Sequence, residues 1–152
     1  MGQLRRFAVP TAEVLLKRKG GKVVTIEKDA SVLQAAEKMN EKRIGALIVV
    51  SGEQAVGIFT ERDILTRVIA AQRSVAETTV AQVMTSPMAC CTRTTRVAEC
   101  KAVMTEKRIR HLPVVEQGKL YGMISSGDVL ANQVANQEDT IHYLSEYLYG
   151  RT

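Results

Sequence analysis

The chain has 152 residues, of which 45% are hydrophobic and 24% are charged. These values are typical of one ordinary domain or two very small ones, and they exclude a disordered or collagen-like chain. The 21 Lys and Arg residues outnumber the 16 Asp and Glu residues, and the net charge of +5 suggests an anionic partner. The cysteines and histidines lack metal-site spacing, and no apolar run approaches the about 20 residues of a membrane span. Without a secretion signal, we expect a cytoplasmic protein.

The first half of the chain predicts alternating helices and short strands. Ser31 and Gln34 have the spacing of a capping box, and the apolar residues that follow recur on one side of a helix. Two apolar runs of strand length, separated by four turn-forming residues, predict an antiparallel hairpin. In chain order, we expect a helix at 11–18, a strand at 23–26, a helix from 31, strands at 46–50 and 55–59, and a helix from Thr60 to about 72.

The second half repeats the first. At an offset of 65 residues, positions 24–65 align without a gap with positions 89–130, and twelve of these forty-two positions are identical. Chance would give roughly two or three, so the chain contains a duplicated unit with one local fold. After a linker at 73–79 and a helical turn at 80–84, the second copy predicts a strand at 89–91, a helix at 95–107, strands at 112–115 and 120–124, and a helix from Ser125.

One copy is too small to form a stable core by itself. Each copy has about 45 residues and continuous apolar strands that need cover on both sides, so the copies must pack on each other. We expect a pseudo-two-fold axis between them, with crevices that suit a ligand. A last helix, at 139–149, has an apolar stripe that fits either docking on the same chain or a subunit interface.

A hydroxyl and a carboxylate recur at the same place in both copies. Thr60 is followed by Asp63, and Ser125 is followed by Asp128, each pair where a strand gives way to a helix. The simplest interpretation is structural, because the hydroxyl caps the helix and the acid complements its dipole. The functional interpretation is that the carboxylate accepts two hydrogen bonds from a ribose diol, while the hydroxyl and free N–H groups hold a phosphate.

This repeat resembles the cystathionine β-synthase (CBS) domain. The resemblance covers residues 24–130 and rests on the motifs at 39–50 and 57–65 and their partners in the second copy. It implies an α+β fold of two β-α-β-β-α domains about a pseudo-two-fold axis, with added N- and C-terminal helices. We place the domains at 8–72, with the N-terminal helix, and at 80–137, followed by a C-terminal helix at 138–152.

The resemblance also implies a ligand and its contacts. CBS pairs bind adenosine-containing ligands, such as AMP, ADP, ATP or NAD, in clefts between the copies. The first cleft would combine Thr60, Arg62 and Asp63 with Met84, Ser86, Ala89, Ile109, Arg110 and His111. The second would combine Ser125 and Asp128 with Lys22, Val24, Ile44, Gly45 and Ala46. The first cleft has more cationic donors, so we expect it to favour the more highly charged ligand.

The sequence departs from the family pattern before the first strand. Lys19, Gly20, Gly21 and Lys22 stand where the second copy has Met84, Thr85, Ser86 and the family's more usual proline, which affects the base contacts of the second cleft. The two glycines fit either a flexible loop or a close approach of backbone N–H groups to an anion.

We therefore expect a regulatory module that binds nucleotides without turning them over. The sequence offers no nucleophile paired with a base and no phosphate-binding glycine loop, so we expect neither an enzyme nor a catalytic cofactor. The family also suggests a homodimer acting on an unidentified protein target. Two alternatives are a basic nucleic-acid-binding adaptor, weakened by dispersed charges and few aromatic residues, and a purely structural dimerisation unit.

Overall fold

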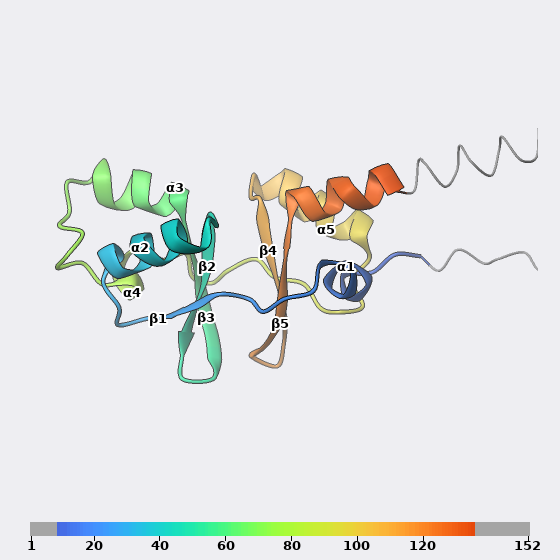
Figure 1. Cartoon of the computed structure of the whole chain (residues 1–152), viewed down its shortest axis with the longest axis horizontal. Helices are drawn as coiled ribbons and strands as arrows, with labels where there is room; N and C mark the ends of the chain where they lie inside the picture. The colour runs from blue at the N-terminus through green and yellow to red at the C-terminus, as the bar shows by residue number, and fades with distance from the viewer. Residues whose placement is uncertain (1–8, 136–152) are drawn as a thin grey trace, which may run out of the picture.

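The computed structural model describes residues 9–135, which form two similar halves side by side (Figure 1). The first half has a three-stranded sheet in the order β1-β2-β3, and the second has the hairpin of β4 and β5. This confirms the predicted α+β class. The elements are α1 (Ala12–Lys19), β1 (Thr25–Glu27), α2 (Val32–Lys42), β2 (Ala46–Ser51), β3 (Gln54–Thr60), α3 (Glu61–Asp63), η1 (Ile64–Ile69), α4 (Val80–Val83), α5 (Val97–Lys107), β4 (His111–Glu116), β5 (Lys119–Ser125) and a last helix over 126–135. The helix predicted at 139–149 lies outside the described residues.

Equivalent residues end equivalent elements in the two halves. The predicted capping box is present, since Gln34 N donates to Ser31 Oγ at 3.1 Å and Ser31 N donates to Gln34 Oε1 at 2.9 Å. Helices α2 and α5 both end at an arginine in the left-handed conformation, with φ of 54° at Arg43 and 55° at Arg108. The hairpins also share a register irregularity near their middle. The duplication in the sequence is therefore a duplication of local structure.

The strand predicted at 89–91 does not form. In the first half, β1 pairs in parallel with β2, and Ile48 N donates to Val24 O at 3.3 Å. The residue equivalent to Ile48 is Pro113, which has no N–H group to donate. Only an isolated parallel bridge, between Cys91 and Val114, remains there. Pro113 removes the pairing on one side of this bridge, and on the other side Arg93 N donates to Glu116 Oε1 at 3.0 Å, whereas its equivalent Lys28 N donates to Val50 O.

The helix predicted from Thr60 to residue 72 changes its winding. After one α-helical turn it continues as the π-helix η1, in which Ala70 N donates to Leu65 O, five residues earlier. The equivalent segment of the second half, 126–135, is α-helical. Within η1, Val68 is buried, whereas Leu65 and Ile69 remain exposed.

The N-terminal helix packs on the second half. Backbone hydrogen bonds join Ala12 N to Thr95 O (2.8 Å) and Val97 N to Pro10 O (3.0 Å), and the buried Ala12 and Leu15 belong to the core around β4 and β5. Arg18 also donates to the buried Asn132 of the last helix at 3.0 Å. The chain therefore crosses from the second half to the first between α1 and β1, immediately after Lys19.

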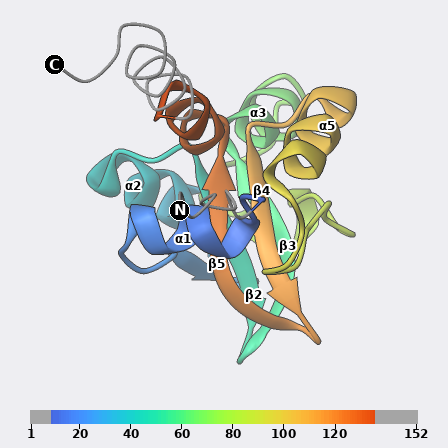
Figure 2. The same ribbon diagram turned by 90° about the vertical axis from the view of Figure 1, so that its right-hand side faces the viewer.

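The two halves share a small apolar core between their hairpins. Each half has its own buried cluster, and a third cluster centres on Ala46, Ile48 and Ile58, with Leu120 and Met123 of the other half packed against it. Figure 2 shows the β4–β5 hairpin lying across the β2–β3 hairpin. The expected packing of one copy on the other is therefore present, and it brings the ends of the strands together.

Candidate functional site

The two recurring carboxylates have the same local geometry. Thr60 N donates to Asp63 Oδ2 at 2.9 Å, and Ser125 N donates to Asp128 Oδ2 at 2.8 Å. In return, each aspartate N–H donates to the hydroxyl, at 3.3 Å in the first half and 3.1 Å in the second. Both acids therefore cap their own helices, as the structural interpretation predicted. Their remaining surroundings differ, and this difference separates the two candidate sites.

The carboxylate of Asp63 is enclosed by the end of the connection between the halves, residues 84–86, which is called the linker from here on. The hydroxyl of Thr85 donates to Asp63 Oδ1 at 3.1 Å, and Arg67 Nε lies 3.7 Å from the same oxygen. Thr85 is fixed by two backbone hydrogen bonds to Ile58, of 2.8 and 3.1 Å. Asp63 is only 5% exposed, so both of its oxygens are bound and little of it reaches solvent.

The linker can approach so closely because residue 57 is a glycine. A Cβ at Gly57 would lie 2.8 Å from Met84 Sδ and 2.9 Å from Thr85 O, closer than packed atoms approach. At the equivalent Gly122, a Cβ would lie 2.5 Å from Leu16 Cδ2 of helix α1. The same position thus admits the linker in one half and α1 in the other.

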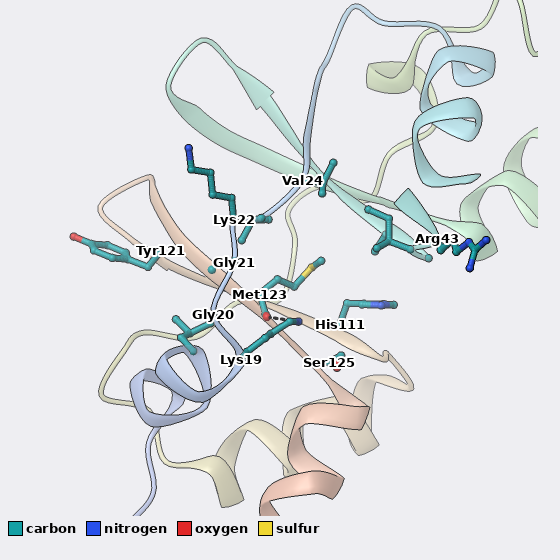
Figure 3. A pocket seen from close by; sticks show the side chains of 16 residues that line it. Lys19, Gly20, Gly21, Lys22, Val24, Arg43, His111, Tyr121, Met123 and Ser125 are labelled. Carbon is teal, nitrogen blue, oxygen red and sulfur yellow. Dashed lines mark hydrogen bonds between the residues drawn. The ribbon is translucent and has the colours of Figure 1, made fainter. Parts of the chain in front are cut away.

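An open pocket of about 390 Å³ lies between the halves, and Figure 3 shows the side chains that line it. Asp128 lies beside this pocket, because it is bonded to the lining residues Ser125 and Lys19. Its carboxylate is 22% exposed and receives the Lys19 ammonium, whose Nζ is 3.0 Å from Asp128 Oδ2 and 3.2 Å from Met123 O. The pocket is lined by Leu16, Lys19, Gly20, Gly21, Lys22, Val23, Val24, Arg43, Ile44, Gly45, Ala46, His111, Tyr121, Gly122, Met123 and Ser125.

The lining combines aliphatic side chains with cationic ones, and the two lysines point in different directions (Figure 3). Val24, Ile44 and Ala46 offer aliphatic surface, while Lys19 and Lys22 add positive charge. A flat apolar ring suits the aliphatic side chains, and an anion suits the cationic ones. The two glycines between the lysines have positive φ, of 63° and 80°, and no atom lies within 4 Å of a Cβ built on either. The backbone there is open to a ligand.

Two ionisable groups at the pocket have shifted pKa values. Burial lowers the pKa of His111, and the charge of Lys19 lowers it further, so the imidazole is neutral near pH 7. Burial raises the pKa of the Asp128 carboxyl, but hydrogen bonds from the Ser125 N–H, Lys19 and the Ser125 hydroxyl outweigh it and hold the pKa below its usual value. At neutral pH, the pocket therefore contains a carboxylate already neutralised by one lysine.

Most residues predicted for the second cleft meet at this pocket. Lys22, Val24, Ile44, Gly45, Ala46 and Ser125 line it, and Asp128 joins it through Ser125 and Lys19. His111 was assigned to the first cleft, but the structure places it in this pocket, because it pairs with Ser125 across the β4–β5 hairpin.

The residues predicted for the first cleft mostly contact other parts of the chain. Thr60 and Asp63 are in contact, and Arg62 donates to Arg108 O of the other half at 3.2 Å. The others are engaged elsewhere: Met84 lies against Gly57, Ser86 donates to Val56 O at 2.9 Å, Ala89 and Ile109 pack on the second core, and Arg110 O accepts from Ser126 N.

The sequence reasoning missed several lining residues, of which Lys19 matters most. Applying the 65-residue offset to Met84, a predicted contact of the first cleft, gives Lys19 as its counterpart. Tyr121 and Met123 could have been found by strand alternation, since they share one side of β5 with Ser125. Arg43 could have been found because it directly precedes Ile44 at the end of α2.

The described residues contain neither a side-chain cluster suited to a metal ion nor a helix that could span a membrane. Within 9–135, there is no cluster of three His, Cys, Asp or Glu side chains that could hold a metal ion. None of the helices in this part of the chain is long and apolar enough to span a bilayer.

Comparisons with known proteins agree on one family. The model of the CBS domain matches residues 15–70 and 80–135. The CBS domain-containing protein CBSX3, mitochondrial, of Arabidopsis thaliana is 35% identical over 153 residues, covering 95% of this chain and 74% of that protein. In three further Arabidopsis CBS-domain relatives, the matched region is 22% of their length, so a similar pair recurs within larger chains.

Solved structures show the same architecture. A candidate signal-transduction protein with CBS domains from Burkholderia ambifaria matches with a TM-score of 0.78 and 41% identity, covering 84% of this chain and 96% of that one. A hexameric CBS-CP12 protein from bloom-forming cyanobacteria matches with a TM-score of 0.71 and 30% identity, covering 82% of this chain and 72% of that one.

Proposed function

The chain belongs to the CBS-domain family, and from this premise we propose that it is a non-catalytic regulatory module that binds an adenine nucleotide in the pocket beside Asp128. The observation that carries the proposal is the position of that carboxylate. It lies at the start of a helix, partly exposed, beside a crevice between the two copies whose lining includes aliphatic and cationic side chains.

Each part of an adenine nucleotide has a counterpart in this pocket. The base would lie against Val24, Ile44 and Ala46, the ribose diol would donate to Asp128, and the phosphate would meet Lys19 and Lys22. A volume of about 390 Å³ falls in the range of pockets that bind small molecules. AMP is the smallest ligand that uses all three parts; ADP, ATP and NAD extend it with further phosphate.

We assign the Asp63 site a structural role in the state described here. Its carboxylate is bound by Thr60, Thr85 and Arg67 within the chain. A ligand could use it only after the linker had moved away from Ile58. The second cleft of the sequence analysis is thus our ligand site, although the first was expected to favour the more charged ligand.

For the module to regulate a partner, ligand binding in the pocket must change how the module contacts that partner. A ligand in this pocket would touch the segments before β1 and between α2 and β2 of the first half, and α1, β4 and β5 on the side of the second half. It would therefore favour one arrangement of the two halves. We propose a second copy of the chain as the first partner, through apolar side chains repeated on the helices that follow β3 and β5. The downstream target is another protein, and we place the module in the cytoplasm.

The test is thermal unfolding of the full chain with a panel of ligands. AMP, ADP, ATP and NAD are each added at millimolar concentration, with GMP as the control for base recognition. A ligand present at 100 times its Kd stabilises by about 2.7 kcal/mol, which a melting curve resolves easily. No shift with any adenine ligand would refute the proposal and leave a duplicated structural module.

A pair of matched variants separates binding from capping. Asp128→Asn should abolish the ligand-induced shift while changing the melting temperature of the free protein little, because this carboxylate is partly exposed. Asp63→Asn should lower the melting temperature of the free protein but retain the shift. The nucleic-acid adaptor predicts instead a steeply salt-dependent affinity for DNA or RNA and no response to AMP.

A further inference from the structure

The ammonium of Lys19 occupies the place where a sugar would bind. Lys19 ends helix α1, and its ammonium donates to Met123 O at 3.2 Å (Figure 3). It also donates to Asp128 Oδ2 at 3.0 Å. Asp128 Oδ2 also accepts the hydrogen bond from Ser125 N that caps the last helix. No described residue donates to Asp128 Oδ1. A diol that donates to both carboxylate oxygens must therefore compete with Lys19.

Breaking the contact between Lys19 and Asp128 costs little stability. The Lys19 side chain is 41% exposed, and ion pairs between partly exposed groups contribute little to stability. An ammonium on a flexible four-carbon chain can also turn to another acceptor without moving the backbone. The next two residues, Gly20 and Gly21, have no neighbour within 4 Å of a Cβ position and leave room for that movement.

The chemistry of the ligand decides what the released ammonium does next. A neutral nucleoside separates the ammonium from Asp128 and offers it no replacement. A phosphorylated ligand offers an anion in the same pocket, so Lys19 exchanges a carboxylate for a phosphate. Lys22 lines this pocket too, but none of its described contacts is with Asp128. It can attract the phosphate without opposing the sugar.

We infer that Lys19 is a specificity-determining residue that makes this pocket prefer nucleotides to the corresponding neutral nucleosides. The inference rests on the proposed function, since it assumes that a sugar diol binds Asp128. It assigns two opposite effects to one side chain, competition with the sugar and attraction of the phosphate. The equivalent of Lys19 at the Asp63 site is the uncharged Met84, so the cation near that carboxylate comes from a different position, Arg67 of the same helical segment.

That equivalence supplies the variant for the test. Lys19→Met introduces the residue that the chain itself carries at the matching position, and a methionine keeps the length of the side chain. Adenosine and AMP are titrated by calorimetry into wild type, Lys19→Met and Lys22→Met. In Lys19→Met we expect adenosine to bind about three- to tenfold more tightly, because it no longer displaces a charge-assisted hydrogen bond. AMP should bind no more tightly than to wild type.

The controls make each outcome decisive. Lys22→Met should weaken AMP and leave adenosine unchanged, and Lys19→Arg, which retains the charge, should keep the wild-type preference. If wild type binds AMP and Lys19→Met binds adenosine no better, the inference is wrong. It is also wrong if AMP gains as much as adenosine. If wild type binds neither ligand at millimolar concentration, the proposed function itself fails, and the inference fails with it.

Discussion

The hydroxyl of Thr85 donates a hydrogen bond of 3.1 Å to Asp63 Oδ1 and thereby joins the linker between the halves to the start of helix α3. The carboxylate that receives this bond is 5% exposed and also accepts from Thr60 N. A buried carboxylate with all its bonds made stabilises the fold, but it is costly to disturb because a lost partner leaves a buried polar atom unsatisfied. The two aspartates should therefore differ in what they contribute to stability.

Asp63→Asn is expected to lower the free energy of unfolding by about 1–3 kcal/mol. One carboxylate oxygen becomes an NH2 group, so the amide can accept from Thr60 or from Thr85 but not from both, and the negative charge beside Arg67 is lost. Asp128→Asn should cost less, since its carboxylate is partly exposed and water can replace lost bonds. Urea unfolding of the free proteins measures both values. Thr85→Val should approach the loss of Asp63→Asn, and equal losses in the two aspartate variants would contradict this account.

A second prediction compares the stability effects of alanine at Gly57 and at Gly122, the two glycines against which another segment packs closely. At Gly57, an added Cβ meets the backbone oxygen of Thr85 at 2.9 Å, and the linker must move. At Gly122, it meets the end of the Leu16 side chain, which can change its rotamer. We expect Gly57→Ala to destabilise by about 1–3 kcal/mol, in the range of overpacked interiors, and Gly122→Ala to destabilise less. The reverse order in thermal unfolding would show that α1 is the less adaptable neighbour.

The sequence predicts far more of this fold than of its site. The 65-residue repeat, the capping boxes and the hairpins follow from local patterns and duplicated positions, and the structure has them. The failed strand at 89–91 depends on the missing N–H group at Pro113 and on the hydrogen bond of Arg93 N to the Glu116 side chain, effects that appear only when the partner strand is known. The repeat pattern does not predict the π-helical winding of η1, since the equivalent positions in the second copy form an α-helix.

The site is harder to predict because equivalent residues need not have equivalent neighbours. Asp63 and Asp128 occupy equivalent positions of the repeat, yet one is covered by the linker and the other borders a pocket. What differs is the segment that precedes each copy, with Met84 and Thr85 in one place and Lys19 and Gly20 in the other. The family resemblance indicated which residues form each cleft, but it did not indicate which cleft is accessible to a ligand.

The pH dependence of stability should report the environment of His111. Burial, with the charge of Lys19, lowers its pKa below the ordinary value of 6.5, so the folded state binds the proton less readily than the unfolded state. Stability is therefore fully present above pH 6.5 and is lost as the pH falls through the window below it, until both states are protonated. His111→Gln should lack this loss between about pH 7 and pH 5.

Urea unfolding of wild type and His111→Gln at several pH values gives the comparison. The carboxyls with lowered pKa values, Asp128 and Glu116, start from ordinary values of 3.8 and 4.5. They lose their contributions at lower pH and do so equally in both proteins. The difference between the two curves thus isolates the imidazole. Parallel curves from pH 7 to pH 5 would contradict the burial of His111 beside Lys19.

The last prediction concerns the proposed second copy. Leu65 and Ile69 on η1 are 63% and 57% exposed, and their equivalents Leu130 and Val134 on the last helix are 61% and 45% exposed. The repeat thus places two matching pairs of exposed aliphatic side chains on the helices that follow β3 and β5. Matching patches in one chain suit an interface in which like surfaces of two copies meet, and burying such side chains is the main source of affinity.

Leu65→Glu combined with Leu130→Glu should convert a dimer into a monomer, because charged groups would be buried against an apolar partner. Light scattering after size-exclusion chromatography measures the mass directly, near 16.7 kDa for one chain. Val9→Glu is a matched control, since Val9 is a 56% exposed aliphatic residue on neither helix. Loss of the dimer in the double variant alone, with an unchanged melting response to AMP, would place the interface on these helices and separate it from the pocket.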